Sequence, residues 1–321
     1  MAEIIVAATQ MACTDNESRN IDRVCELVRE AAAMGAHIVL PQELFSGPYF
    51  CKDELPEHFV LARPLDESPA VRRMSALAAE LGVVIPASFF ERSNQAHYNS
   101  LAMIDADGRV MGLYRKSHIP QGPGYGEKFH FTPGDTGFRV WRTRYGTVGV
   151  GVGWDQWFPE CARSMALLGA DVLLYPTAIG TEPAEPAEPA EPAEPARDSS
   201  GHWTRTMQGH AAANMMPLVA SNRVGEEFGK GFSMTFHGSS FIAGPQGEIV
   251  QQAGRNEECV LTAAFDFEAI RSERAGWGLF RDRRPDLYHP LLTFDGLDGL
   301  PGEGDEDDCG DHCGCGCGGE A

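Results

Sequence analysis

The chain has 321 residues, 43% of them hydrophobic, and a formal net charge of −20. Twelve acidic residues and no Lys or Arg lie in a Glu-Pro-Ala repeat at 182–196 and an acidic tail at 301–321. The rest of the chain therefore has a net charge of only −8, and it carries no basic stripe for nucleic-acid binding. The chain contains no run of about 18 apolar residues, so it predicts no membrane span. Because the N-terminus also lacks a basic region before an apolar run, we expect a cytoplasmic protein without membrane partners.

The first third of the chain alternates between apolar runs and amphipathic segments. The predicted elements are a strand at 3–9, a helix at 20–34, a strand at 37–40, a helix at 68–81 and a strand at 83–90. A glycine follows each helix, as is common at helix ends. This alternation favours an α/β protein.

Glu43 comes directly after the predicted strand at 37–40. A carboxylate at the end of a parallel strand lies where α/β sheets place their chemistry. The same position also fits a helix-capping or solvated acid. Tyr49, a few residues further on, fits either the wall of the same pocket or packing on the surface.

Lys116 follows a predicted hairpin, whose strands at 99–104 and 110–114 flank a turn with a glycine. A lysine at the end of a strand is ordinarily a solvated edge charge. The next segment, at 121–137, is rich in Gly and Pro and carries Glu127. Such a loop is suited to line a pocket.

The segment at 147–160 predicts a strand, a sharp turn and a helix. Alternating valines indicate the strand, and Pro159 fits the first turn of the helix. Such a turn presents one residue and aims backbone N–H groups at an oxyanion, which suits a nucleophile. Here that residue is Gly153, which has no side chain. Alternatively, Gly149, Gly151 and Gly153 share one strand face and let another element approach closely.

The rest of the chain completes the pattern. Its predicted elements are strands at 138–141, 171–175, 218–222, 239–243, 248–253 and 259–265 and helices at 202–214 and 267–275. We expect one domain at 1–300, interrupted by the low-complexity insertion at 182–196, which proline in every third position should keep extended and solvated. The tail at 301–321 has a composition typical of disorder.

The tail also contains several potential metal ligands. Cys309, His312, Cys313, Cys315 and Cys317 have donor types that bind zinc or another soft metal, but their spacing matches no structural zinc template. The two interpretations are adventitious metal binding and an unstructured tail.

Several motifs occur in an order that is specific to one family. Pro41-Gln42-Glu43-Leu44-Phe45, then Tyr114-Arg115-Lys116, then Trp-Asp-Gln-Trp-Phe-Pro-Glu at 154–160 resemble the nitrilase superfamily of carbon–nitrogen hydrolases, and the segments at 122–129, 175–180 and 207–210 extend the match. The resemblance covers about residues 3–295 without the repeat. It implies an α/β fold, a single-domain αββα sandwich that pairs sheet to sheet with a second subunit in a four-layer stack, as a homodimer or a higher homo-oligomer.

The resemblance also implies the roles of individual residues. Glu43 would be the general base, Lys116 the stabiliser of the oxyanion, and Glu127 the second glutamate that positions the lysine or the substrate. Trp154, Tyr49 and, more remotely, Glu182 would contact the substrate, a small-molecule carbamoyl-amine. The chemistry needs no cofactor and no metal.

The sequence departs from the family pattern at the nucleophile. Gly153 stands where the family has Cys, and neither Cys51 nor Cys161, eight residues further on, is expected to replace it. We therefore predict an amidohydrolase of the carbamoyl-amine type in an inactive form. The alternatives are a pseudoenzyme that binds a carbamoyl-amine without turnover, and an amidase for another carbamoyl or ureido substrate.

Overall fold

The computed structural model describes residues 3–181, 183 and 197–297. The chain divides into two compact units, Met1–Arg274 and Ala275–Ala321, which are described separately. Most of the Glu-Pro-Ala repeat, including Glu182, and the whole acidic tail lie outside the described residues, as do the cysteines of that tail. The predicted domain boundary at residue 300 stays a prediction.

Strands and helices alternate along the chain, as the sequence predicts. The strands are β1 (Ile4–Gln10), β2 (Ile38–Leu40), β3 (Ile85–Ser93), β4 (Ala96–Ile104), β5 (Val110–Arg115), β6 (Val140–Thr143), β7 (Gly146–Val150), β8 (Val172–Pro176), β9 (Leu218–Ser221), β10 (Val224–Phe228), β11 (Ser233–His237), β12 (Phe241–Ala243), β13 (Ile249–Gln252) and β14 (Cys259–Phe265). The helices are α1 (Glu17–Ala33), α2 (Pro69–Leu81), α3 (Glu127–His130), α4 (Pro159–Leu167), α5 (Ser200–Asn214) and α6 (Phe267–Trp277).

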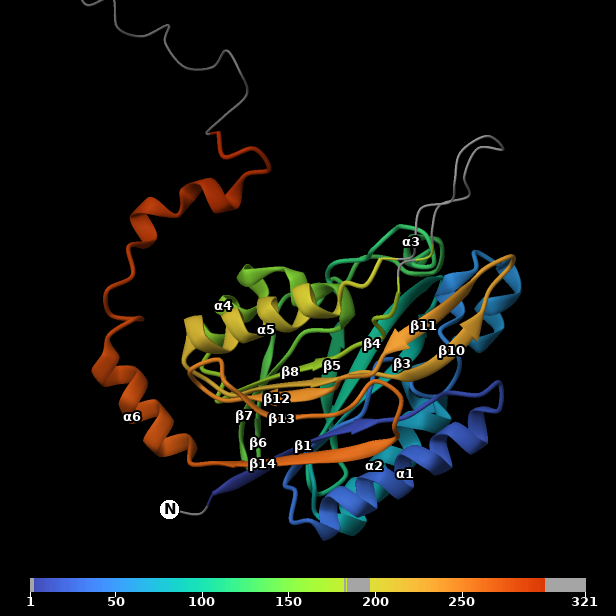
Figure 1. Ribbon diagram of the computed structural model, residues 1–321, viewed down its shortest axis with the longest axis horizontal. Helices are drawn as coiled ribbons and strands as arrows, with labels where there is room; N and C mark the ends of the chain where they lie inside the picture. Colours follow the sequence, from blue (N-terminus) through green and yellow to red (C-terminus); the bar gives the residue numbers. More distant parts are fainter. Residues whose placement is uncertain (1–2, 182, 184–196, 298–321) are drawn as a thin grey trace, which may run out of the picture. The chain divides into compact units, whose positions relative to one another are not determined.

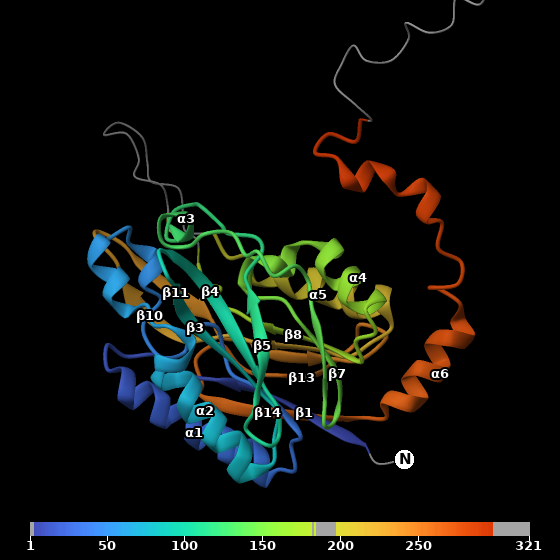
Figure 2. The ribbon, with the colours of Figure 1, turned by 180° about the vertical axis from the view of Figure 1, so that it is seen from behind.

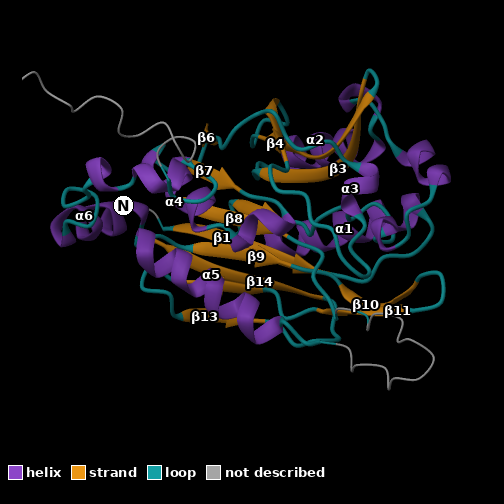
Figure 3. Cartoon of the chain, turned by 90° about the horizontal axis from the view of Figure 1, so that it is seen from above, coloured by secondary structure: helices purple, strands orange, loops and turns teal. Residues whose placement is uncertain are grey.

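In the first unit, β-sheets pack face to face between two layers of helices (Figure 1). One sheet has the strand order β13-β12-β9-β8-β7-β6. The strands β14-β1-β2 and β3-β4-β5 lie opposite, and a parallel bridge between Ile38 and Val84 connects them. Helices α1 and α2 cover the outer face of these strands, while α4 and α5 cover the first sheet (Figures 1 and 2). Figure 3, seen from the side of α4 and α5, shows α5 lying along that sheet.

This arrangement is the αββα sandwich that the family resemblance implies, and its strand β1 is buried on both faces. In β1, Val6 and Ala8 lie in the core between the sheets, whereas Ala7 lies in the core under the helices. That second core also contains Val24 of α1 and Met74 of α2. Because both faces are covered, the strand reads as a continuous apolar run instead of an alternating one.

Local signals set the helix ends. The Ser68 hydroxyl accepts from the Val71 N–H at the start of α2, and Gly82 ends the helix with φ +69°. This confirms the predicted helix at 68–81 to within a residue. Helix α1 begins three residues before the predicted position, because the Asn16 side chain caps it by accepting from the Arg19 N–H.

The sequence prediction missed two hairpins. The strands β10 and β11 form one, in register from Val224 with His237 to Phe228 with Ser233. The other joins β3 to β4 through a turn at Asn94, which has φ +53°. Both strand pairs carry charged residues within them, so their apolar pattern is weak.

The helical layers bear on the predicted dimer. Helices cover the outer face of each sheet within one subunit, and no contact within one subunit tests the predicted sheet-to-sheet pairing. The dimer itself stays a prediction. Among the described helices, none combines the length and apolar character needed to cross a bilayer.

The second unit begins within the last turns of α6. It continues through two short 3₁₀ segments, Pro285–Leu287 and His289–Leu292. Several of its large apolar side chains are exposed, among them Leu292 and Phe294.

Candidate active site

Residues far apart in the sequence meet near the ends of the strands. Glu43 follows β2, Lys116 follows β5, Glu127 begins α3, and Gly153 follows β7. The Lys116 ammonium lies 3.0 Å from the Glu43 carboxylate (Oε1) and 2.7 Å from that of Glu127 (Oε2). The structure thus brings together the predicted base, oxyanion stabiliser and second glutamate.

All three charged groups are almost completely buried, with at most 2% of each exposed. Burial lowers the pKa of Lys116, but the attraction of Glu127 and Glu43 outweighs it, so the pKa is raised above its ordinary value. Burial raises the pKa of Glu127, against the opposing pull of Lys116. The lysine is therefore firmly cationic, and the site can stabilise negative charge on a bound oxygen.

Two further side chains hold these carboxylates. The side-chain amide of Asn99 donates to Glu43 Oε1 at 2.6 Å. The backbone carbonyl of Asn99 accepts from the backbone N–H of Lys116 at 2.9 Å. The Tyr49 hydroxyl donates to Glu127 Oε1 at 2.6 Å. Sequence reasoning did not find Asn99, because it lies inside a strand without a local signal.

Tyr49 differs from its prediction as a substrate contact. It is completely buried, and it is not one of the described residues that line the cavity. Burial raises the pKa of its phenol well above the ordinary value, so the hydroxyl keeps its proton for Glu127. The segment after Glu43 turns inward, which places Tyr49 behind the second carboxylate.

The strand, turn and helix around Gly153 are confirmed, with a 3₁₀ turn at Gly153–Trp157 between β7 and α4. Asp155 fixes this turn from within and is completely buried. Its carboxylate accepts from the Val152 N–H at 3.0 Å, the Tyr114 hydroxyl at 2.7 Å and the His118 N–H at 3.0 Å. The turn is therefore held by its own acid and by the segment around Lys116.

Gly153 adopts φ +48°, a conformation that L-residues with side chains rarely adopt. A Cβ atom on Gly153 would lie 2.6 Å from Glu43 Oε2 and 2.6 Å from Lys116 Nζ. Both neighbours are ends of flexible side chains that can move apart. Position 153 therefore faces the base and the lysine directly, which is the placement that a nucleophile needs.

The other two glycines of this strand serve close packing, as the alternative interpretation predicts for them. A Cβ atom on Gly149 would meet Met165 at 3.0 Å, and one on Gly151 would meet the Tyr175 ring at 2.6 Å. These neighbours are packed side chains of the core. Close approach thus explains two glycines of the series, while the third faces the charged groups.

Neither of the nearby cysteines is placed as a nucleophile. Cys161 lies in α4, completely buried, with its sulfur 4.0 Å from the Tyr175 hydroxyl. Cys51 is completely buried in an apolar cluster. Burial raises the pKa of both thiols well above the ordinary value, so thiolate formation is disfavoured.

A cavity of about 490 Å³ opens onto the charged groups. Trp154, which is partly exposed, lines it as predicted, whereas Glu182 lies outside the described residues. Five further wall residues lie in the motifs of the family resemblance but were given no individual role: Tyr125, Gln156, Trp157, Thr177 and Ile179. Gln121 and Arg197 also line the cavity and lie outside those motifs. In the part of the chain that the structure describes, no cluster of three or more His, Cys, Asp or Glu side chains is placed to hold a metal ion.

Comparisons with known proteins show the family of the chain. A family model described as carbon-nitrogen hydrolase matches residues 5–275. An N-carbamoylputrescine amidase from Oryza sativa subsp. japonica is 57% identical over 92% of this chain and 96% of its own length. A citrullinase from Francisella tularensis is 51% identical over 91% of this chain and 99% of its own. The crystal structure of a carbon-nitrogen hydrolase from Helicobacter pylori G27 superposes with a TM-score of 0.82 at 38% identity, covering 91% of this chain and 99% of that one.

Proposed function

We propose, on the premise that this chain belongs to the carbon–nitrogen hydrolase family, that its cavity binds the terminal carbamoyl group of N-carbamoylputrescine. The relatives from rice and potato that carry the name N-carbamoylputrescine amidase are 57% and 58% identical to it. The citrullinase relative, at 51% identity, bears the name of another substrate with a terminal carbamoyl group on an aliphatic chain. This shared group is the part of the substrate that the charged residues would hold.

One observation carries the proposal. A side chain at position 153 would project between the Glu43 carboxylate and the Lys116 ammonium, 2.6 Å from each at its Cβ. Amide hydrolysis through a covalent intermediate needs a nucleophile, a base and an oxyanion stabiliser within hydrogen-bond reach of one another. The site supports two of these roles and presents the backbone position for the third.

We assign the roles as follows. With a thiol at position 153, Glu43 takes its proton, sulfur attacks the carbamoyl carbon, and Lys116 with the Trp154 N–H stabilises the oxyanion. Collapse of that adduct releases the amine, which takes the proton that Glu43 holds. Glu43 then activates a water that hydrolyses the carbamoyl thioester, and the carbamic acid that leaves decomposes to carbon dioxide and ammonia. In sum, N-carbamoylputrescine and one water give putrescine, carbon dioxide and ammonia. Glu127 keeps Lys116 cationic and in place through contacts of 2.7 and 2.8 Å.

Gly153 closes this route in the present sequence, because no sulfur is available to form the thioester. We therefore propose that this form binds the substrate without measurable turnover. Such a carbamoyl-amine-binding pseudoenzyme is the second candidate function, and the glycine is the observation that favours it. A homo-oligomer and a cytoplasmic location stay part of the proposal as expectations.

The experiment separates binding from turnover. Calorimetry with the Gly153 protein measures its affinity for N-carbamoylputrescine, citrulline, a β-ureido acid and a simple amide. Ammonia release from the same panel is then measured with Gly153→Cys. We expect binding by both forms and hydrolysis by Gly153→Cys alone, fastest with N-carbamoylputrescine. Inactivity of Gly153→Cys on every carbamoyl compound would refute the proposed function, and preference for another member of the panel would replace the substrate.

A further inference from the structure

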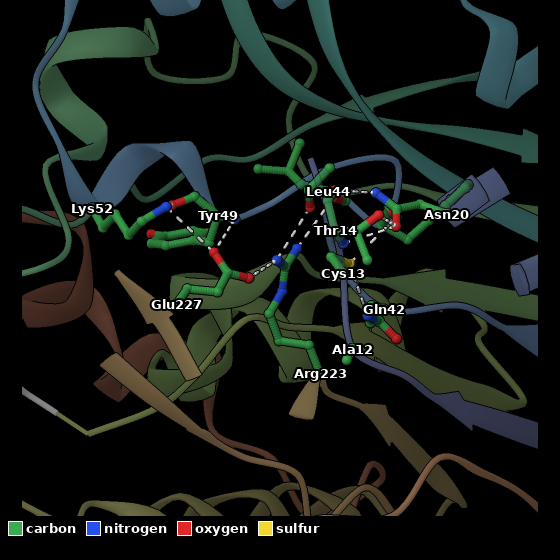
Figure 4. A network of polar contacts seen from close by, with 12 residues as sticks. Ala12, Cys13, Thr14, Asn20, Gln42, Leu44, Tyr49, Lys52, Arg223 and Glu227 are labelled. Atoms are coloured by element: carbon green, nitrogen blue, oxygen red, sulfur yellow. Dashed lines mark hydrogen bonds and ion pairs between the residues drawn. The ribbon is translucent and has the colours of Figure 1, made fainter. Parts of the chain in front are cut away.

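A completely buried arginine, Arg223, contacts the backbone of the segment that begins with Glu43 (Figure 4). Its Nη2 donates to the carbonyl oxygens of Glu43 at 2.9 Å and Leu44 at 3.1 Å, and its Nη1 donates to that of Gly47 at 3.2 Å. One guanidinium therefore binds three carbonyls of a segment that lies outside helices and strands. Planar, multiple donation of this kind is specific to arginine.

The bound segment needs such support because its backbone is strained. Leu44 has φ +48°, in the left-handed region that non-glycine residues avoid. Its N–H donates to the Ser88 hydroxyl at 3.0 Å, and its carbonyl accepts from Arg223. The strained residue is the immediate neighbour of Glu43, so a relaxed backbone at Leu44 would displace the Glu43 carboxylate from Lys116.

The acid that pairs with this arginine connects it to the second carboxylate. Glu227 Oε1 lies 2.8 Å from Arg223 Nη1, and Glu227 Oε2 accepts from the Tyr49 N–H at 2.7 Å (Figure 4). Lys52 also approaches Glu227, at 3.4 Å. The Tyr49 phenol donates to Glu127 in turn, so a continuous chain of contacts runs from the arginine to Glu127.

We infer that Arg223 and Glu227 are positioning residues that fix both carboxylates of the site, Glu43 through its backbone and Glu127 through Tyr49. This pair is called the Arg223–Glu227 clamp below. The inference rests on the roles proposed above for Glu43 and Glu127. Neither Arg223 nor Glu227 itself lines the cavity, so the clamp acts on the site only through the residues that it contacts.

A salt bridge that merely stabilises the fold would leave the carboxylates unchanged when it is weakened. The clamp would not. Burial raises the pKa of Glu127, and the Tyr49 hydrogen bond, which favours the charged carboxylate, opposes that rise. Any change that removes or misplaces the Tyr49 hydroxyl should raise the pH at which Glu127 becomes protonated. This readout separates positioning from stability.

The first experiment uses the Gly153 protein and needs no activity. Infrared titration follows the carboxyl band that Glu127→Gln removes, in Tyr49→Phe, Arg223→Lys and the control Arg271→Met. Arg271 pairs with buried Asp171 at 2.7 Å through both Nε and Nη2, outside the cavity and the clamp. We expect the titration midpoint to rise by about one pH unit in Tyr49→Phe and in Arg223→Lys, as the loss or weakening of a charge-assisted hydrogen bond predicts. Arg271→Met should leave it unchanged.

The second experiment uses Gly153→Cys. Arg223→Lys keeps the charge but not the three-carbonyl contact, so we expect kcat to fall about 100-fold, the effect of a displacement of about 1 Å, with little change in KM. Arg271→Met should keep kcat within about twofold. An unshifted titration in folded Tyr49→Phe and Arg223→Lys, or an unchanged kcat in Arg223→Lys, would overturn the clamp. If Gly153→Cys itself is inactive, the proposed function fails, while the infrared titration still decides the clamp.

Discussion

The site has two parts, a group of buried charged residues and the turn at position 153. The first part contains all the side chains that the family resemblance implies, whereas the second lacks the side chain of a nucleophile. Glu43, Lys116 and Glu127 form a buried network in which each charge has an opposite partner within 3.0 Å. The turn has the backbone shape for a nucleophile but carries only a hydrogen atom at Gly153. The difference shows that the charged network does not depend on the nucleophile for its own electrostatic balance.

The physical reason is the cost of unpaired buried charge. Removing one partner from a buried ion pair typically destabilises a protein by about 3–5 kcal/mol, because the other charge is left without compensation. A thiol that is absent at position 153 leaves no such charge behind. The proposed absence of a nucleophile at the turn is therefore compatible with an intact fold and cavity.

The largest expected effect comes from adding a nucleophile at position 153. Gly153→Cys should raise the rate of N-carbamoylputrescine hydrolysis by about 10⁶, the typical loss when a triad nucleophile is removed. Gly153→Ala is the matched control, because it adds the same Cβ at the same strained φ without sulfur. Ammonia release under single-substrate conditions measures both. Equal rates in the two variants would show that the turn does not carry the nucleophile.

The next largest effect comes from removing Lys116 from the buried charged residues. Lys116→Met should lower the free energy of unfolding by about 3–5 kcal/mol, because it leaves two buried carboxylates without their shared cation. Urea denaturation measures this loss. A loss below about 1 kcal/mol would mean that solvent reaches the carboxylates and that the network is not a buried one.

A smaller effect separates two kinds of glycine, Gly151 just after β7 and Gly153 in the turn itself. Gly151→Ala should cost about 2–3 kcal/mol, because its Cβ would meet the packed Tyr175 ring and the Cys161 sulfur. Gly153→Ala should cost only about 1–2 kcal/mol, since the strain of its φ is the main penalty and its neighbours can move. Thermal and urea unfolding of the two variants, side by side, test this order. A larger loss in Gly153→Ala would reverse our assignment of the two positions.

The smallest effect lies in the pH dependence of the network. The pKa of Lys116 is raised in the folded protein, so the folded state holds this proton more tightly than the unfolded state. The resulting stability is fully present below the ordinary value of about 10.5 and is lost as the pH rises above it, by about 1.4 kcal/mol per pH unit. Unfolding measured between pH 9 and 11.5 should show this decline in the Gly153 protein and a shallower one in Lys116→Met. Parallel curves would contradict the assignment.

Much of the fold follows from local signals in the sequence. The last predicted strand, at 259–265, coincides with β14, and the helix at 68–81 is α2 to within a residue. The resemblance to a known family, carried by the motifs around Glu43, Lys116 and 154–160, implied that these residues share one site, but no local signal did. Apolar periodicity, helix caps and turn residues involve only a few neighbouring positions, so they can be recognised in the sequence without the tertiary structure.

What only the tertiary structure decided are contacts between residues far apart in the chain. Lys116 and Glu43 are 73 residues apart, and Arg223 and Glu43 are 180 apart. Tyr49 lies in the loop that follows Glu43, and nothing in the local sequence distinguishes a cavity wall from a support for Glu127. The hairpin of β10 and β11, which carries Glu227, has a polar sequence whose buried face appears only when it packs against Tyr49 and Arg223. The pattern of apolar and polar residues indicates which face of a segment is exposed to solvent. Which residue pairs with a buried charge depends instead on how the layers of the fold pack together.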